Sequence, residues 1–180
     1  RAGDEPVESV FDILSLDDDV RNSLLGLADE KMADVAVFCN NYPNIEVSYE
    51  IKDSNEIVAG EPVQIAVKME RDIDTDDITD EEMANLGKVT APLFPNEKKE
   101  SWWIVVGDLG QNNLLSLKRV DLRDKLKVQI EFLAPEEPGD YDLTLFLMSD
   151  SYLGCDQEYS FSLSVAAADS DESEDDSTSK

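Results

Sequence analysis

The sequence predicts a mainly β protein built from short antiparallel strands. After Pro43 the spacing of apolar residues changes from 3.6 to 2, so that apolar and polar side chains alternate. Turn signals rich in Gly, Pro and Asp separate the alternating segments, and no crossover helix is indicated between them. Seven strands are therefore expected, at residues 45–51, 63–69, 102–106, 114–120, 126–132, 141–147 and 159–165.

Seven such strands predict an antiparallel sandwich of the immunoglobulin or fibronectin type III kind. Two details agree with this fold. A tryptophan pair lies on the third strand, and Tyr141 opens the sixth strand, where such folds often place a tyrosine corner. The chain has two cysteines, Cys39 and Cys155, and lacks the cysteine pair of antibody domains, which favours the fibronectin-like variety and a reducing compartment.

A short helical unit is expected before the sandwich. Between Ala28 and Pro43, with Asp29 as N-cap, four apolar residues recur at helical spacing: Met32, Val35, Ala36 and Cys39. Two shorter helical segments are expected around residues 10–14 and 24–25. The chain thus divides into a helical segment with an acidic start at 1–43, a sandwich at 44–166 and an acidic tail at 167–180.

The charge balance excludes several classes of function. The 180 residues include 42 Asp and Glu, 15 Lys and Arg and no histidine, for a net charge of −27. Nucleic acids and anionic membranes attract basic surfaces, so we expect no direct contact with either. Without histidine there is no Ser-His-Asp or Cys-His pair and no Cys/His zinc site. No carboxylate pair stands out for catalysis, which predicts a non-enzyme without cofactor or metal.

The acidic residues concentrate in three segments, at 1–20, 70–82 and 169–180, so the folded core is expected to be only moderately acidic. The insert at 70–82 has acids at several positions of an EF-hand loop that starts at Asp72. However, Asp77 replaces the turn glycine and Met83 replaces the bidentate glutamate. A solvated loop between strands is therefore favoured over a calcium site.

The tail at 167–180 is low-complexity and is predicted to be disordered. Ser173 is followed by three acids, a context that acidophilic kinases prefer, which makes it a candidate phosphorylation site. A plain solubilising tail is the favoured alternative. At the other end, the chain starts at Arg1 without a signal-like segment, and we expect it to be a piece of a longer protein.

Two of the expected strands break the alternation, and they predict an interaction surface. Residues 101–106 are apolar on both faces, and Phe146 and Met148 point opposite to the other apolar residues of their strand. The third and sixth strands of such a sandwich are neighbours in one sheet. Either Trp102 or Trp103 should then join Phe146 and Met148 in an apolar patch on its outer face, the kind of patch that marks an interface. The alternative is that the N-terminal helices cover this patch.

Several stretches resemble one known family. They lie at residues 34–50, 91–95, 99–108, 117–119 and 148–159, and include Lys99-Glu-Ser-Trp-Trp-Ile-Val-Val-Gly-Asp108. From about Phe11 to Val165 the chain resembles the carboxy-terminal Sec homology module of the tandem-cassette DExH RNA helicases of the spliceosomal U5 snRNP. That resemblance implies a helix-loop-helix followed by an immunoglobulin-like sandwich, without the helical bundle that precedes them in the family.

The resemblance also implies a role. In the family the last cassette is ATPase-inactive, serves as a protein-docking platform and modulates the active cassette of an ATP-dependent RNA helicase. The implied partners are splicing factors, snRNP proteins and the rest of the parent helicase, in the nucleus. The equivalent module of the endoplasmic-reticulum translocation protein remains an alternative, although the run at residues 154–159 fits the helicases better. An alternative of another class is a free-standing acidic chaperone for basic proteins such as histones, whose binding should collapse with salt.

Overall fold

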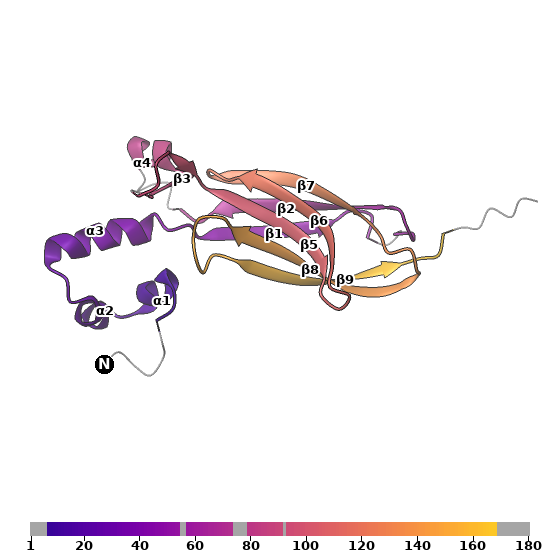
Figure 1. Cartoon of the computed structure of the whole chain (residues 1–180), viewed down its shortest axis with the longest axis horizontal. Helices are drawn as coiled ribbons and strands as arrows, with labels where there is room; N and C mark the ends of the chain where they lie inside the picture. The colour runs from indigo at the N-terminus through magenta and orange to yellow at the C-terminus, as the bar shows by residue number, and fades with distance from the viewer. Residues whose placement is uncertain (1–6, 55–56, 74–78, 92, 169–180) are drawn as a thin grey trace, which may run out of the picture.

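The computed structural model describes residues 7–54, 57–73, 79–91 and 93–168. Two antiparallel sheets lie face to face in it (Figure 1). The three-stranded sheet has the order β1-β2-β7, with β1 at Ile45–Ile51, β2 at Pro62–Arg71 and β7 at Lys125–Leu133. The four-stranded sheet has the order β6-β5-β8-β9, with β6 at Asn113–Asp121, β5 at Ser101–Asp108, β8 at Gly139–Ser149 and β9 at Gln157–Val165.

These seven strands are the seven that the alternation predicts, and the mainly β sandwich is confirmed. The fourth sandwich strand, β6, pairs with β5 and so belongs to the four-stranded sheet. In constant-type immunoglobulin domains the fourth strand extends the other sheet, so this topology agrees with the fibronectin-like variety. The tyrosine corner is present as well, because the Tyr141 hydroxyl donates a 2.8 Å hydrogen bond to the Glu137 carbonyl.

A small hairpin was not expected from the sequence. It consists of β3 (Lys88–Val89) and β4 (Lys98–Lys99), which are too short to show any alternation. The acidic insert also differs from its expected bounds. Strand β2 continues to Arg71, and a short helix, α4, occupies Asp80–Asn85. Residues 74–78, which form the centre of the EF-hand comparison, lie outside the described residues, as do the tail at 169–180 and Ser173.

The inward side chains of the two sheets form one hydrophobic core. Alternation places every second residue between the sheets, and each fully buried large side chain there contributes about 1.5–3 kcal/mol. The largest are Trp102, Ile65, Met69, Ile104, Leu122, Leu143, Leu145, Leu147 and Leu163. Because this core fixes which side of each strand faces inward, it also fixes which side chains form the outer faces.

Three helices precede the sandwich, as expected: α1 (Val10–Ser15), α2 (Asp18–Leu25) and α3 (Asp29–Asn40). Helix α1 begins with a capping box, in which Ser9 and Asp12 each bond the other's backbone N–H. The expected N-cap of α3 is wrong by one residue. Ala28 occupies the cap position without a capping side chain, and Asp29 lies in the first turn, where its charge stabilises the positive end of the helix dipole.

An aromatic cluster joins the helical unit to one end of the sandwich. The Tyr42 ring makes edge contacts with Phe11, Phe38 and Tyr152 at centroid distances of 5.7, 5.6 and 5.0 Å. The Tyr42 hydroxyl also donates a 2.7 Å hydrogen bond to the Leu153 carbonyl. Helices α1 to α3 therefore lie beyond the end of the sheets and not over their outer faces (Figure 1).

Candidate protein-interaction face

Trp102 and Trp103 point to opposite sides of β5, a distinction that the sequence left open. Trp102 is completely buried in the core, and its indole Nε1 donates a 2.8 Å hydrogen bond to the Glu100 carboxylate. Trp103 is half-buried and, by the alternation of the strand, lies on the outer side of the four-stranded sheet. Of the two candidates, Trp103 therefore lies on the outer face and Trp102 lies in the core.

Strand register brings four more apolar side chains alongside Trp103. On β8, Met148 lies opposite Trp103 and Phe146 lies opposite Val105. On β6, Leu117 lies opposite Val105. We name this set the apolar face: Trp103, Val105, Leu117, Phe146 and Met148. Met148 is 41% exposed and Leu117 is 52% exposed, so the face is open to solvent.

The sequence pointed to Phe146, Met148 and a tryptophan, but it did not point to Leu117. The fourth strand has leucines at 114, 115 and 117, so alternation alone cannot assign one side of this strand to the core. Pairing with β5 decides the matter, and pairing is a tertiary property. The adjacent leucines were nevertheless a signal, because a strand that is apolar on both sides offers one apolar side to the outside.

An ionic corner borders the apolar face. The Arg119 guanidinium lies over the Trp103 ring, 5.6 Å from its centroid, within the range of a cation–π interaction. Arg119 is held there by the Asp150 carboxylate at 2.5 Å, which also accepts from Lys98 at 3.2 Å. Burial opposes ionisation of Asp150, but hydrogen bonds from Ser151, Arg119 and Lys98 outweigh it and lower the Asp150 pKa to about 2. The corner therefore stays charged and holds Arg119 against the ring.

Asp150→Asn is expected to destabilise the protein at pH 7 and to lose this effect in acid. The folded pKa of Asp150 lies below the ordinary value of about 3.9, so its carboxylate adds stability above that pH and loses it as the pH falls towards 2. Urea unfolding of both proteins between pH 7 and pH 2.5 measures the difference. Glu136→Gln, an exposed carboxylate in the turn before β8, is the control and should show no such convergence. The prediction would be contradicted if the difference in unfolding free energy between the wild type and Asp150→Asn stayed constant across this pH range.

The outer face of the three-stranded sheet is polar. Glu70 on β2 lies between Lys68 at 2.8 Å and Lys125 at 2.6 Å. Gln64 donates a 3.0 Å hydrogen bond to Glu131 on β7. Hydrogen bonds from Lys125 and Lys68 lower the pKa of Glu70 to about 2. The two outer faces of the sandwich thus differ in chemistry, and the apolar one lies on the four-stranded sheet.

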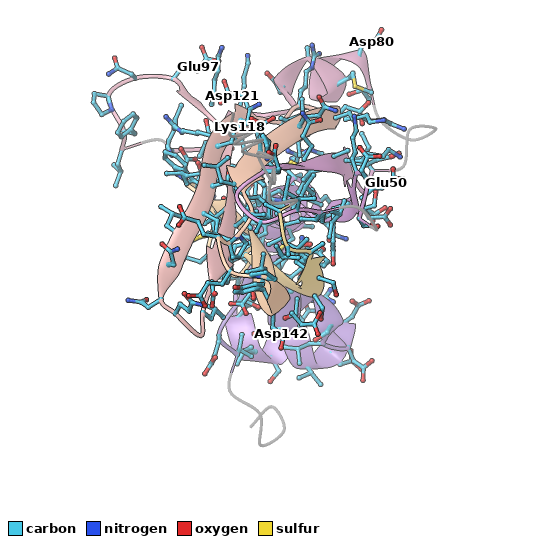
Figure 2. All side chains as sticks on the ribbon, turned by 90° about the vertical axis from the view of Figure 1, so that its right-hand side faces the viewer. Glu50, Asp80, Glu97, Lys118, Asp121 and Asp142 are labelled. Carbon is cyan, nitrogen blue, oxygen red and sulfur yellow. The ribbon has the colours of Figure 1, made fainter. Side chains whose placement is uncertain are left out.

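Side chains close the seams between the two sheets. On both sides of the sandwich they donate hydrogen bonds to carbonyls of the facing edge strand, and Lys118 lies where β6 meets β7 (Figure 2). The bonds are Ser116 to Glu131 at 2.9 Å, Lys118 to Gln129 at 2.9 Å and Gln157 to Ile45 at 2.8 Å. A partner strand that paired with an edge strand would need the carbonyls of that strand to be free. These bonds occupy three acceptors that a strand added at β1 or β7 would otherwise use.

A cleft of about 470 Å³ lies between α3, residues 85–90 and the helical end of the sandwich. Val37 and Phe38 line one wall, and Arg71 and Glu100 lie at the inner side. The Glu100 carboxylate already accepts hydrogen bonds from Arg71 and Trp102, so it is not a free acid or base. The cleft therefore offers a packing surface and no evident catalytic group.

The cysteines and carboxylates of the described residues show no metal-binding arrangement. Both cysteines are buried free thiols, and burial raises the pKa of Cys155 to about 12, which keeps its thiol protonated and unreactive. Within the described part of the chain, no group of three or more Cys, Asp and Glu side chains could hold a metal ion. Among the same residues, no helix combines the length and apolarity needed to span a membrane.

Comparison with known proteins identifies the family. Residues 7–162 match the family model of the Sec63 Brl domain. The chain is 48% identical over 175 residues to the U5 small nuclear ribonucleoprotein 200 kDa helicase of Mus musculus, an alignment that covers 97% of this chain and 8% of that protein. The protein of the same name from Drosophila melanogaster is 50% identical over 165 residues, covering 92% of this chain and 7% of that protein.

A plant protein, the DExH-box ATP-dependent RNA helicase DExH12 of Arabidopsis thaliana, is 46% identical over 159 residues, covering 88% of this chain and 7% of that protein. The chain thus spans less than a tenth of the length of these relatives, and it contains no motor domain. The family model covers far more than half of the chain and confirms the resemblance that its motifs indicate. This chain belongs to the Sec63 Brl domain family.

Proposed function

We propose that this chain is a non-catalytic protein-docking module of a spliceosomal U5 helicase, and that its apolar face binds splicing factors or other snRNP proteins in the nucleus. The observation that carries the proposal is a group of five neighbouring apolar side chains on the outer face of the four-stranded sheet, in a chain whose relatives include U5 helicases. Through this docking the module would modulate the helicase in pre-mRNA splicing.

The composition of the apolar face supports a binding role. Aromatic residues, Met and Arg are enriched in protein interfaces, and Trp, Tyr and Arg are enriched among the residues that carry most of the binding energy. Here Trp103, Phe146 and Met148 lie together with Arg119 at their border. The polar outer face of the other sheet lacks this combination among its described residues.

The helical unit supports a second contact, with the rest of the parent helicase. No residue of α1 or α2 is buried, and only Cys39 is buried in α3. Apolar side chains of the unit are exposed instead: Leu14, Leu24, Leu27, Val37 and Phe38. Apolar surface of this extent favours cover by a neighbouring domain, and the helical bundle and motor domains of the parent chain are the proposed neighbours.

Phe146→Asp is expected to abolish capture of spliceosomal proteins while leaving the thermal midpoint unchanged within a few degrees. Phe146 is half-buried on the outer face, so a carboxylate there costs the folded chain little stability. A bound partner would bury that carboxylate without a counter-charge, which opposes binding. The measurement is a pull-down of U5 snRNP proteins from nuclear extract, beside a thermal melt.

Leu133→Asp is the matched control, because Leu133 is 64% exposed on β7, in the other sheet. It should retain wild-type capture. The proposal would be contradicted if Phe146→Asp captured these proteins as well as the wild type does. It would also be contradicted if Leu133→Asp lost as much capture as Phe146→Asp.

The net charge favours one second candidate, an acidic chaperone for basic proteins such as histones. Its binding would rest on long-range charge attraction, which screens with salt, whereas apolar docking is comparatively salt-tolerant. Capture of histones that disappears at moderate salt and is unaffected by Phe146→Asp would support this candidate instead.

A further inference from the structure

The outer side of β8 changes character along its length. Its outward side chains near the helical end, Met148 and Phe146, are apolar, whereas those at the other end, Asp142 and Asp140, are carboxylates. Asp142 lies four positions before Phe146, which corresponds to about 13 Å along a strand. A partner that covers the apolar face along β8 therefore also approaches these carboxylates.

Neighbouring hydroxyls hold the two carboxylates in place. On β9, Ser162 donates a 2.9 Å hydrogen bond to Asp142, and Ser164 donates a 2.6 Å hydrogen bond to Asp140. Each pair lies directly across the strand pairing. The carboxylate positions are thus set by the sheet before any partner arrives, which lowers the entropy lost when a cation pairs with them.

The carboxylates border a shallow hollow of about 430 Å³. Its lining includes Asp108, Asp140 and Asp142. It also includes Thr144, which lies between Asp142 and Phe146 on the outer side of β8. None of the lining residues is a Lys or Arg. The other end of the sheet differs, because there Arg119 and Lys98 neutralise Asp150.

The hollow suits a basic side chain better than a metal ion. Among the described residues, its carboxylates do not converge in a group that could hold a metal ion. A guanidinium or ammonium group on a flexible stem needs no such convergence and is attracted by a local excess of negative charge.

We propose that the partner segment bound by this chain carries an apolar anchor for the apolar face and, about 13 Å away, a Lys or Arg for the hollow at Asp140 and Asp142. The inference rests on the proposed docking function and specifies the chemistry of the partner. An extended segment reaches this spacing in about four residues, and a helix in about nine.

The test uses displayed random 16-residue peptides as the probe, selected on the wild-type chain and counter-selected on Phe146→Asp. The recovered peptides should combine an apolar residue with a Lys or Arg. Their binding should weaken about tenfold in the double variant Asp140→Asn and Asp142→Asn, and by less at high salt. Asparagine retains an acceptor for each serine, so the change removes charge and keeps the fold.

The matched control is the double variant Glu46→Gln and Glu50→Gln, which removes the same charge from β1. Glu50 and Asp142 lie on different sides of the sandwich (Figure 2). This control should bind the peptides as the wild type does. This inference would be overturned, and the docking function would stand, if the peptides need Phe146 but lack a basic residue. The same holds if they bind the double variant Asp140→Asn and Asp142→Asn as tightly as the wild type. If the counter-selection on Phe146→Asp leaves no peptide that binds the wild type, both the docking function and this inference fail.

Discussion

Glu100→Gln is expected to lower the free energy of unfolding by about 3–5 kcal/mol, because it removes one partner of a buried ion pair. Arg71 and Glu100 lie 2.5 Å apart, and their side chains are only 4% and 2% exposed. Glutamine retains an acceptor for the Trp102 indole, so the change isolates the effect of leaving the Arg71 guanidinium without its counter-charge. Urea unfolding at pH 7 measures the loss.

The double variant Arg71→Met and Glu100→Gln provides the control. It removes both charges and should recover more than half of the stability lost in the single variant. Recovery should be incomplete, because Arg71 also donates a 3.0 Å hydrogen bond to the Arg123 carbonyl. A single variant within about 1 kcal/mol of the wild type would show that water reaches this pair, contrary to its burial.

This ion pair shows what sequence patterns cannot predict. In the sequence Arg71 follows the alternating residues 63–69 and precedes a run of acids, which assigns it to the acidic insert, whereas in the structure it is the last residue of β2. Glu100 precedes the tryptophan pair and resembles any surface acid in sequence. Only the packing of β2 against β5 brings the two together, along with the Trp102 indole. A single charged residue carries no periodicity that distinguishes a buried position from an exposed one.

The strands were predictable for the opposite reason. A strand with one buried face repeats its apolar residues at every second position, as Val63, Ile65, Val67 and Met69 do on β2. The signal fails where both faces are apolar, as on β5 and β6. On β8, Phe146 and Met148 indicated an outward apolar surface. Which side chains of β5 and β6 join that surface depends on strand register, which the residues of one strand do not encode.

Trp102→Ala and Trp103→Ala are expected to lower the stability by very different amounts, although the two residues are adjacent. Trp102 is fully buried, so its truncation should cost about 3–5 kcal/mol of unfolding free energy. Trp103 is half-buried beneath Arg119, so its truncation should cost about 1 kcal/mol. Urea unfolding measures both values. Capture of U5 snRNP proteins should fall with Trp103→Ala, in which the folded sandwich remains.

Since Trp102→Ala itself can fail to fold, Trp102→Phe serves as the milder variant. It keeps most of the ring volume but removes the indole N–H, so Glu100 loses one donor while it keeps Arg71. A loss of about 1–3 kcal/mol is expected, with capture of partners retained. If instead Trp103→Ala destabilised as strongly as Trp102→Ala, its ring would belong to the core, and the apolar face would lose its largest member. The assignment of one tryptophan to folding and its neighbour to binding therefore depends on this one comparison.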